Sequence, residues 1–123
     1  MEEKSDIPQQ TRKVAIIGAG PSGLLAAKYC KSHSEVTIFE SKSAIGGNWL
    51  YTDINEGNHP DLESDDYYKL YKCLHSSMYK DLTANLPKQL MTFKDFLHKE
   101  ETPTIQTHSQ FLEYIKAYAE HFE

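Results

Sequence analysis

The chain has 123 residues, enough for one compact domain with a single hydrophobic core. Its 13 Lys and Arg against 18 Asp and Glu give a net charge of −5, which excludes the broad basic face that nucleic acid or anionic lipid requires. No apolar run is long enough to span a bilayer, and residues 1–12 lack the apolar core of a secretory signal. We therefore expect a disordered, solvated tail over residues 1–12 and one domain over residues 13–123, with no membrane segment within this chain.

A strand, a helix and a second strand are expected first. Val14–Ile17 is a continuous apolar run closed by Gly18, typical of a parallel strand buried on both faces. Residues 22–32 suit a helix, with the Ser22 hydroxyl close to its free N-terminal amides. Residues 35–40 return to the β-branched and aromatic composition of a strand. The pattern predicts an α/β fold: a right-handed strand-helix-strand unit that starts a Rossmann-like domain, with an incomplete parallel sheet.

The remainder of the chain is predicted to consist mainly of loops and helices. Residues 41–60 are rich in Ser, Gly and Asn, which favours a long irregular segment. Apolar residues between positions 67 and 74 fit one helical stripe, and Leu86-Pro87 breaks any continuation. A last helix is expected from Thr107, whose spacing to Gln110 is that of a capping box, to the end of the chain. Its apolar stripe consists of Phe111, Ile115, Tyr118 and Phe122.

The turn after the first strand has the glycine spacing of a dinucleotide-binding fingerprint. Gly18 permits the tight turn, Gly20 lets the backbone approach a pyrophosphate, and Gly23 lets the helix pack closely on the strand. Free amides and the positive dipole end of the helix would hold the phosphates, so a chain of net charge −5 can still bind a diphosphate. The turn residues predicted to bind the cofactor are Gly18, Ala19, Gly20, Pro21, Ser22 and Gly23.

An acidic residue stands where the fingerprint requires one. Glu40 follows Gly18 by 22 residues, at the end of the second expected strand. Its carboxylate can accept hydrogen bonds from the ribose hydroxyls of an adenosine and would repel a 2′-phosphate. Strand, turn, helix and carboxylate together predict a dinucleotide site that favours FAD or NAD over NADP. The alternative is a glycine-rich turn that binds nothing.

Two further segments resemble the flavin-containing monooxygenase family. Gly46-Gly47-Asn48-Trp49 is similar to a GGxW element that follows the ribose-binding Glu in that family and lies along the FAD. Residues 82–96, with the sequence LTANLPKQLMTFKDF, are similar to the family's segment around its active-site asparagine. The resemblance runs from about Lys13 to Glu123. It makes FAD the expected cofactor of the first site.

The resemblance also implies roles for particular residues. Asn85 would be the catalytic residue, beside the flavin ring, with an amide able to hydrogen-bond a bound nicotinamide cofactor. The other residues implied to contact the flavin or line the path toward it are Gly47, Asn48, Trp49, Ala84 and Leu86. Without the resemblance, Trp49 would be a packing aromatic and Asn85 a cap or turn residue.

The chain departs from the family pattern in two respects. Leu97 stands where the family often has a proline, which suggests a locally altered loop. The family's second glycine-rich fingerprint, for NADPH, and its histidine-containing motif are absent from these residues. The NADPH site is therefore not contained in this chain.

The resemblance implies a flavin monooxygenase that uses FAD, NADPH and molecular oxygen to oxygenate a nitrogen or sulfur nucleophile. This chain would be its N-terminal FAD-binding part, poorly stable and inactive alone, because two strands with one crossover do not complete a doubly wound sheet. A Baeyer-Villiger or N-hydroxylating flavin monooxygenase, and a non-catalytic nucleotide-binding fragment or interaction module, remain open. The expected location is the cytoplasm, or the cytoplasmic face of the endoplasmic reticulum if a longer parent carries an anchor. No metal site is expected, because the six histidines show no pair at ligand spacing.

Overall fold

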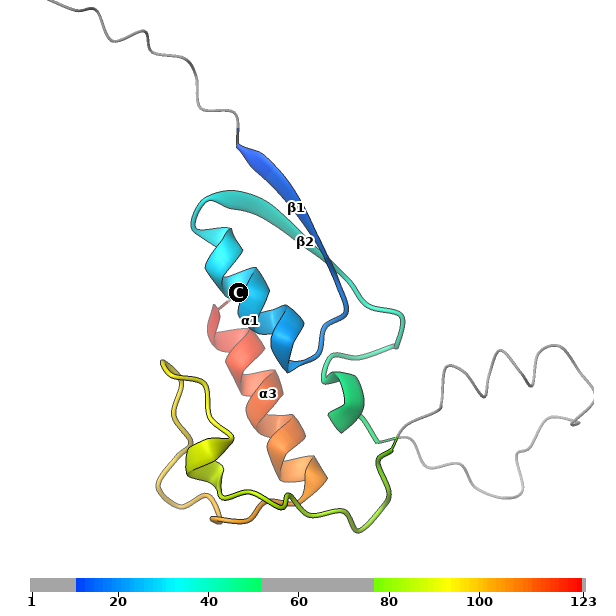
Figure 1. Cartoon of the computed structure of the whole chain (residues 1–123), viewed down its shortest axis with the longest axis vertical. Coiled ribbons are helices and arrows are strands. Elements are labelled where there is room, and N and C mark those ends of the chain that lie inside the picture. The colour runs from blue at the N-terminus through cyan, green and yellow to red at the C-terminus, as the bar shows by residue number, and fades with distance from the viewer. Residues whose placement is uncertain (1–10, 52–76, 123) are drawn as a thin grey trace, which may run out of the picture.

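The structure is a computed structural model that describes residues 11–51 and 77–122. Two parallel strands, β1 (Arg12–Ile17) and β2 (Ser34–Phe39), are joined by the helix α1 (Pro21–Lys31), as Figure 1 shows. The register pairs the first residues of the two strands with each other, and likewise the last. The predicted strand-helix-strand unit is confirmed, and each boundary lies within two residues of the expected one.

A second long helix packs beside this unit. Helix α3 (His108–Phe122) lies next to α1, and two short 3-10 turns, η1 (Gly47–Trp49) and η2 (Lys88–Leu90), interrupt irregular segments (Figure 1). The architecture is the α/β start of an FAD-binding fold, as the sequence predicts. The helix expected between positions 67 and 74 and the irregular residues 52–60 lie outside the described residues.

The start of α3 is fixed by the predicted capping box. The amide of Gln110 donates to Oγ1 of Thr107 at 3.3 Å, and the amide of Thr107 donates to Oε1 of Gln110 at 3.0 Å. These two bonds satisfy amides that the first helical turn leaves free. The expected stripe is confirmed as well: Phe111, Ile115 and Tyr118 are buried, and Phe122 is half-buried.

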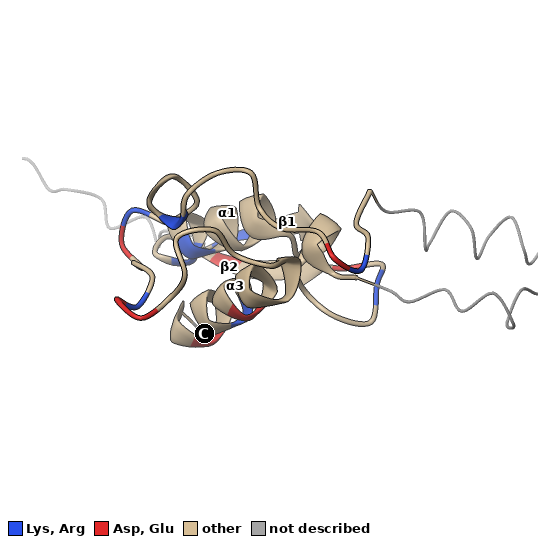
Figure 2. Cartoon of the chain, turned by 90° about the horizontal axis from the view of Figure 1, so that it is seen from below, with Lys and Arg blue, Asp and Glu red and all other residues tan. Residues whose placement is uncertain are grey.

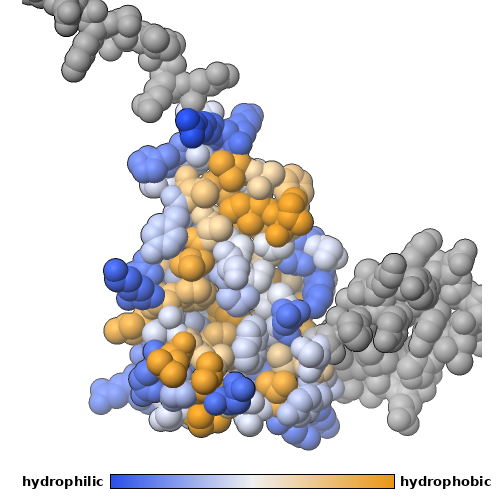
Figure 3. Space-filling model, viewed as in Figure 1, coloured by the Kyte–Doolittle hydropathy of each residue, from blue (hydrophilic) through white to orange (hydrophobic). Residues whose placement is uncertain are grey.

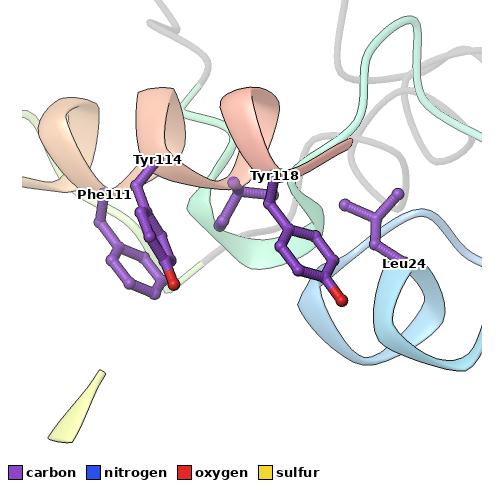
Figure 4. Close-up of a cluster of buried hydrophobic side chains, with 5 residues drawn as sticks. Leu24, Phe111, Tyr114 and Tyr118 are labelled. Carbon is purple, nitrogen blue, oxygen red and sulfur yellow. The ribbon is translucent and has the colours of Figure 1, made fainter. Parts of the chain in front are cut away.

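The hydrophobic core lies between α1 and α3. Figure 4 shows aromatic side chains of α3 in one row and Leu24 of α1 facing Tyr118. The buried residues of this cluster are Leu24, Phe111, Tyr114, Ile115 and Tyr118. Because α3 supplies four of these five side chains, the docking of α3 determines how much apolar surface the described fold buries.

Tyr114 ties the segment before α3 to the helix. Its hydroxyl donates to the carbonyl of Phe96 at 2.5 Å and accepts the amide of Phe93 at 2.7 Å. The ring of Phe93 in turn stacks on Tyr118, with ring centroids 3.9 Å apart. The loop that carries residues 91–98 is therefore held by both hydrogen bonds and aromatic packing.

The expectation that β1 is buried on both faces is wrong for the described chain. Exposure alternates along both strands, and Ile17 and its register partner Phe39 are 83% and 55% exposed. Helix α1 packs on the sheet, but no described element makes a second layer over the outer face. Figure 3 shows apolar side chains at the surface over the strands.

The expectation that the Ser22 hydroxyl caps α1 is also wrong. Gly20 is the N-cap residue, and no side chain makes a cap hydrogen bond. Pro21 occupies the first helical position, which places Ser22 one position too far into the helix to cap it. The first turn of α1 therefore keeps amides that its own side chains do not satisfy.

The described surface has mixed charge. Figure 2 shows positions of Lys and Arg interspersed with those of Asp and Glu along the loops and helices. Neither of the long helices in residues 11–51 and 77–122 is long and apolar enough to cross a membrane.

Candidate nucleotide-binding site

Gly18 ends β1 in a conformation that favours glycine. Its φ is +95°, in the left-handed region, and its amide donates to the carbonyl of Phe39 at 2.7 Å. This bond joins the end of β1 to the end of β2. The chain then turns into α1, whose first backbone bond runs from the amide of Leu24 to the carbonyl of Gly20 at 3.0 Å.

Gly23 brings α1 close to β1. A Cβ on Gly23 would overlap the carbonyl oxygen of Gly18 and lie 3.5 Å from Cγ2 of Ile16. Any side chain here would push the helix away from the strand. The expected close packing of helix and strand is therefore present at this glycine.

The two glycine segments contact each other. A Cβ on Gly20 would lie 3.4 Å from Cα of Gly47, and one on Gly47 would lie 2.9 Å from Cα of Gly20. Gly47 also has a φ of +59°. The amide of Gly46 donates to the carbonyl of Ala19 at 2.9 Å. The turn at Gly46-Gly47 is thus docked on the fingerprint, which brings the predicted residues Ala19, Gly20 and Gly47 together.

Gly46 has a role that the sequence analysis did not assign. Its φ is +128°, and a Cβ there would overlap Cδ1 of Leu112 in α3. The residue is buried between η1 and α3. The sequence signal for it was the glycine pair itself, because a second glycine in a pair often marks a second backbone constraint.

Glu40 anchors the fingerprint turn through backbone amides. Its Oε2 accepts the amide of Ala19 at 2.6 Å, and its Oε1 accepts the amide of Lys42 at 2.8 Å. The hydrogen bond from Ala19, followed by that from Lys42, holds the pKa of the Glu40 carboxyl below its ordinary value. The carboxylate is therefore charged at neutral pH, directly beside the turn.

Lys42 links this carboxylate to the second glycine segment. While its amide binds Glu40, its ammonium donates to the carbonyl of Gly47 at 3.2 Å. No spacing rule points to this residue, so its role could not be predicted from the sequence. It joins the predicted ribose-binding residue to the turn predicted to lie along the flavin.

The lowered pKa of Glu40 predicts a pH dependence of stability. The charged form is favoured by folding, so its contribution is present above the unfolded pKa and is lost as the pH falls through the lower folded pKa. We expect Glu40→Gln to lower the free energy of unfolding at pH 7 and to lose less stability than the wild type between pH 6 and 3. Urea unfolding across this range measures both, with the exposed Glu120→Gln as the control. Parallel curves for Glu40→Gln and wild type would refute the assignment.

The two predicted residues after Gly47 differ in solvent exposure. Asn48 is exposed, whereas Trp49 is half-buried and packs on Phe111 with ring centroids 4.5 Å apart. Trp49 thereby attaches η1 to α3. Trp49 therefore has the packing role that was the alternative interpretation of this residue.

Asn85 lies in an exposed bend between Ala84 and Leu86. Ala84 is buried and donates its amide to the carbonyl of Gln106 at 2.7 Å, while Leu86 is 46% exposed. A short antiparallel bridge between Thr83 and Thr107 holds this bend near the start of α3. Within the described ranges no interaction joins the Asn85 side chain to the glycine turns.

The arrangement at the fingerprint is suited to bind the diphosphate and the ribose of a nucleotide. The glycines of the turn have no side chain that would keep a ligand away from the backbone. The first turn of α1 lacks a side-chain cap, and a charged carboxylate lies next to the turn. Amides and a helix dipole attract phosphate, and a carboxylate accepts ribose hydroxyls. Across residues 11–51 and 77–122, no three His, Cys, Asp or Glu side chains are placed to hold a metal ion.

Fold and site together define an α/β protein with a dinucleotide-type fingerprint. Residues 11–123 match the family described as FMO-like, flavin-binding monooxygenase-like. The chain belongs to this family.

Three relatives give the extent of the similarity. A dimethylaniline monooxygenase [N-oxide-forming] 4 of Oryctolagus cuniculus is 34% identical in a match that covers 91% of this chain and 18% of the relative's length. A GS-OX-like flavin-containing monooxygenase relative of Arabidopsis thaliana is 34% identical in a match that covers 94% of this chain and 71% of the relative's length. The solved structure of S-allyl-L-cysteine S-oxygenase from Allium sativum superposes with a TM-score of 0.69 at 35% identity, over 91% of this chain and 26% of that one. The chain thus spans about a fifth of the length of the mammalian relatives it matches.

Proposed function

We propose that this chain is the FAD-binding portion of an NADPH-dependent flavin monooxygenase that transfers oxygen from O2 to a nitrogen or sulfur nucleophile. The observation that carries the proposal is the contact between the two glycine segments, together with the Glu40 carboxylate that accepts the amide of Ala19 in the first of them. Family membership makes a flavin the dinucleotide that fits this site.

Each part of the site has a distinct task in this proposal. FAD, when bound, supplies the redox chemistry. The amides of the turn from Gly18 to Gly23 hold its diphosphate, and Glu40 accepts the ribose hydroxyls. Gly47, Asn48 and Trp49 line the path toward the ring system. The chain's contribution is to bind and orient the cofactor.

Ala84, Asn85 and Leu86 are assigned to the reactive end of the cofactor. Asn85 has an exposed side-chain amide, which can both donate and accept hydrogen bonds. The buried Ala84 fixes the backbone next to it through its bond to Gln106. NADPH is assigned to residues that this chain does not contain.

The substrate class rests on the names of the relatives. One is named for forming an N-oxide of dimethylaniline, and another is named as an S-oxygenase of S-allyl-L-cysteine. Both acceptor atoms are nitrogen or sulfur with a free electron pair. We extend this class, and no particular substrate, to the parent enzyme of this chain, in the cytoplasm or on the cytoplasmic face of the endoplasmic reticulum.

A second candidate is a nucleotide-binding module without catalysis. It is favoured by the two-stranded sheet and by the exposed Asn85, which no described interaction joins to the turns. This candidate shares the diphosphate site with the first. The two differ in whether the chain serves a catalytic parent protein, since we expect the 123-residue chain alone to turn over no substrate under either candidate.

The test separates nucleotide binding from retention of flavin. We expect the chain to bind ADP reversibly, with amide NMR shifts at Gly18–Gly23, and to lose FAD on desalting because the flavin end of the site is incomplete. Glu40→Ala should weaken ADP binding about tenfold, the loss of a charged hydrogen-bond acceptor. The matched control is Glu120→Ala, an exposed glutamate of α3 whose removal should leave the affinity unchanged.

One outcome would oppose the proposal, and another would oppose the expectation that the isolated site is incomplete. If ADP shifts no amide of the turn in a chain whose circular dichroism shows folded helices, the fingerprint does not bind a nucleotide. If flavin absorbance survives desalting at close to one FAD per chain, the site is complete and the expected instability of the isolated chain is wrong.

A further inference from the structure

A backbone hydrogen bond on each side holds the bend at residues 85–87. Before the bend, the amide of Ala84 donates to the carbonyl of Gln106 at 2.7 Å. After it, the amide of Lys88 donates to the carbonyl of Thr104, also at 2.7 Å. The three residues of the bend therefore lie opposite the single residue between Thr104 and Gln106, as in an enlarged β-bulge. Bulges change the direction in which a side chain is presented.

The bend presents Asn85 at the surface but does not leave it free to move. Asn85 and Leu86 are exposed, whereas the anchor on their N-terminal side, Ala84, is buried. Pro87 follows, and its φ of −66° is the value that the proline ring fixes. A displacement of Lys88 is therefore passed on toward Asn85, because Pro87 cannot absorb it by rotation about φ.

The side chain of Lys88 anchors the bend as well. Its ammonium donates to the carbonyls of Lys99, Glu100 and Thr102 at 3.0, 2.9 and 2.6 Å. An ammonium group has three hydrogens, so the three carbonyls match its donors in number. A lysine suits this arrangement, because a compact charge can meet carbonyls that converge on one atom.

These bonds hold the main chain of the loop at residues 99–104. All residues of the loop except the half-buried Thr102 are exposed, so packing contributes little to its position. Hydrogen bonds from a charged donor are stronger than those between neutral groups. They also act on backbone carbonyls, which are less free to rearrange than the acidic side chain of a surface ion pair. The ammonium of Lys88 is therefore the main attachment of this loop to η2.

We propose that Lys88 is a positioning residue for Asn85. Its ammonium fixes the loop at residues 99–104 against η2, which holds the C-terminal end of the bend and sets where the Asn85 amide is presented. Lys88 acts through Asn85 and does not itself have to touch the cofactor. The inference rests on the proposed function, in which Asn85 meets the reactive end of the cofactor. It adds that the amide is held in place before the cofactor binds.

The first test uses the wild-type chain of 123 residues, labelled for NMR. Ammonium hydrogens that are bonded to the protein exchange slowly with water. We expect the ammonium of Lys88 to give a resolved signal at low temperature, and the ammonium of the exposed Lys94 to exchange faster. Equal exchange at the two lysines would show that the three bonds do not persist in solution and would overturn the inference.

A substitution then removes the ammonium alone. Lys88→Met keeps most of the apolar length of the side chain. It should raise amide hydrogen exchange in the loop at residues 99–104 about tenfold or more, and shift the backbone and side-chain signals of Asn85. Lys94→Met, the same change at an exposed lysine, should alter the exchange less than about twofold and leave the Asn85 signals in place.

Chemical rescue separates the effect of the ammonium from a general loss of stability. Lys88→Ala removes three carbons and the nitrogen, and propylammonium consists of these atoms. Added propylammonium should slow exchange in the loop again and return the Asn85 signals toward their wild-type positions in a saturable manner. The control is 1-propanol, which has the same length but no charge and a single donor, and should do neither.

Two further results would overturn the inference. One is an Asn85 signal that stays in place in Lys88→Met while exchange in the loop rises. The other is a loop that propylammonium reorders in Lys88→Ala without any return of the Asn85 signals. Both differ from a failure of the proposed function, which shows as the absence of ADP shifts at Gly18–Gly23 in the wild-type chain.

Discussion

Replacement of Gly23 by alanine is expected to destabilise the strand-helix-strand unit strongly. The added Cβ would overlap the Gly18 carbonyl oxygen and lie 3.1 Å from the Gly18 carbonyl carbon, so backbone atoms have to move. Overpacking against backbone at this point should cost about 3 kcal/mol. That is a large part of the stability of any small domain. Urea unfolding followed by helical circular dichroism measures the loss.

Two other substitutions in the same unit calibrate this effect. Ala26→Ser, at an exposed position of α1, should change the free energy of unfolding by less than about 0.5 kcal/mol. Gly18→Ala meets no atom within 4 Å but forces alanine to a φ of +95°, which should cost about 2 kcal/mol. Equal stability of Gly23→Ala and Ala26→Ser would show that the helix does not rest on the strand at Gly23.

The strand-helix-strand unit could be predicted because its signals are local. The apolar run before Gly18, the glycine spacing and the β-branched run before Glu40 each specify their own element. The capping box between Thr107 and Gln110 is local as well, and both of its hydrogen bonds are present. Signals of this kind do not depend on what the rest of the chain does.

The exposure of the sheet could not be predicted in the same way. An apolar strand indicates that both faces can be buried, but which element covers each face depends on the rest of the fold. The described chain covers only the face toward α1, which leaves Ile17 and Phe39 exposed. The composition of β1 is that of a strand buried on both faces. In the described residues, however, β1 belongs to a sheet with one face exposed.

The residues of the candidate site also differ in whether local sequence signals predict them. The residues from Gly18 to Gly23, and Glu40, follow from spacing rules with a physical basis. Gly46 acts through a tertiary contact with Leu112, for which the glycine pair is only a weak local signal. Lys42 acts through the carbonyl of Gly47, and no spacing rule points to it. Asn85 was named only through the resemblance, and its assignment remains a prediction.

Ile115→Ala is expected to give the second large loss of stability, about 4 kcal/mol, because the residue is fully buried at the centre of the α3 stripe. The cavity would lie in the cluster on which Trp49 also packs, through its contact with Phe111. Loosening of α3 should therefore loosen η1, and with it the contact between Gly47 and Gly20. We expect ADP affinity to fall along with the free energy of unfolding, measured by titration and urea unfolding.

The matched control is on the same helix. Lys116→Ala removes a surface ion pair with Glu113 and should cost no more than about 0.5 kcal/mol, with ADP affinity unchanged. A destabilised Ile115→Ala that binds ADP as tightly as wild type, under conditions where it is still folded, would show that α3 supports the core without positioning the glycine turns. A joint loss would show that the nucleotide site depends on a helix that begins 61 residues after Gly47 in the sequence, since Gly47 is held in place through η1 and α3.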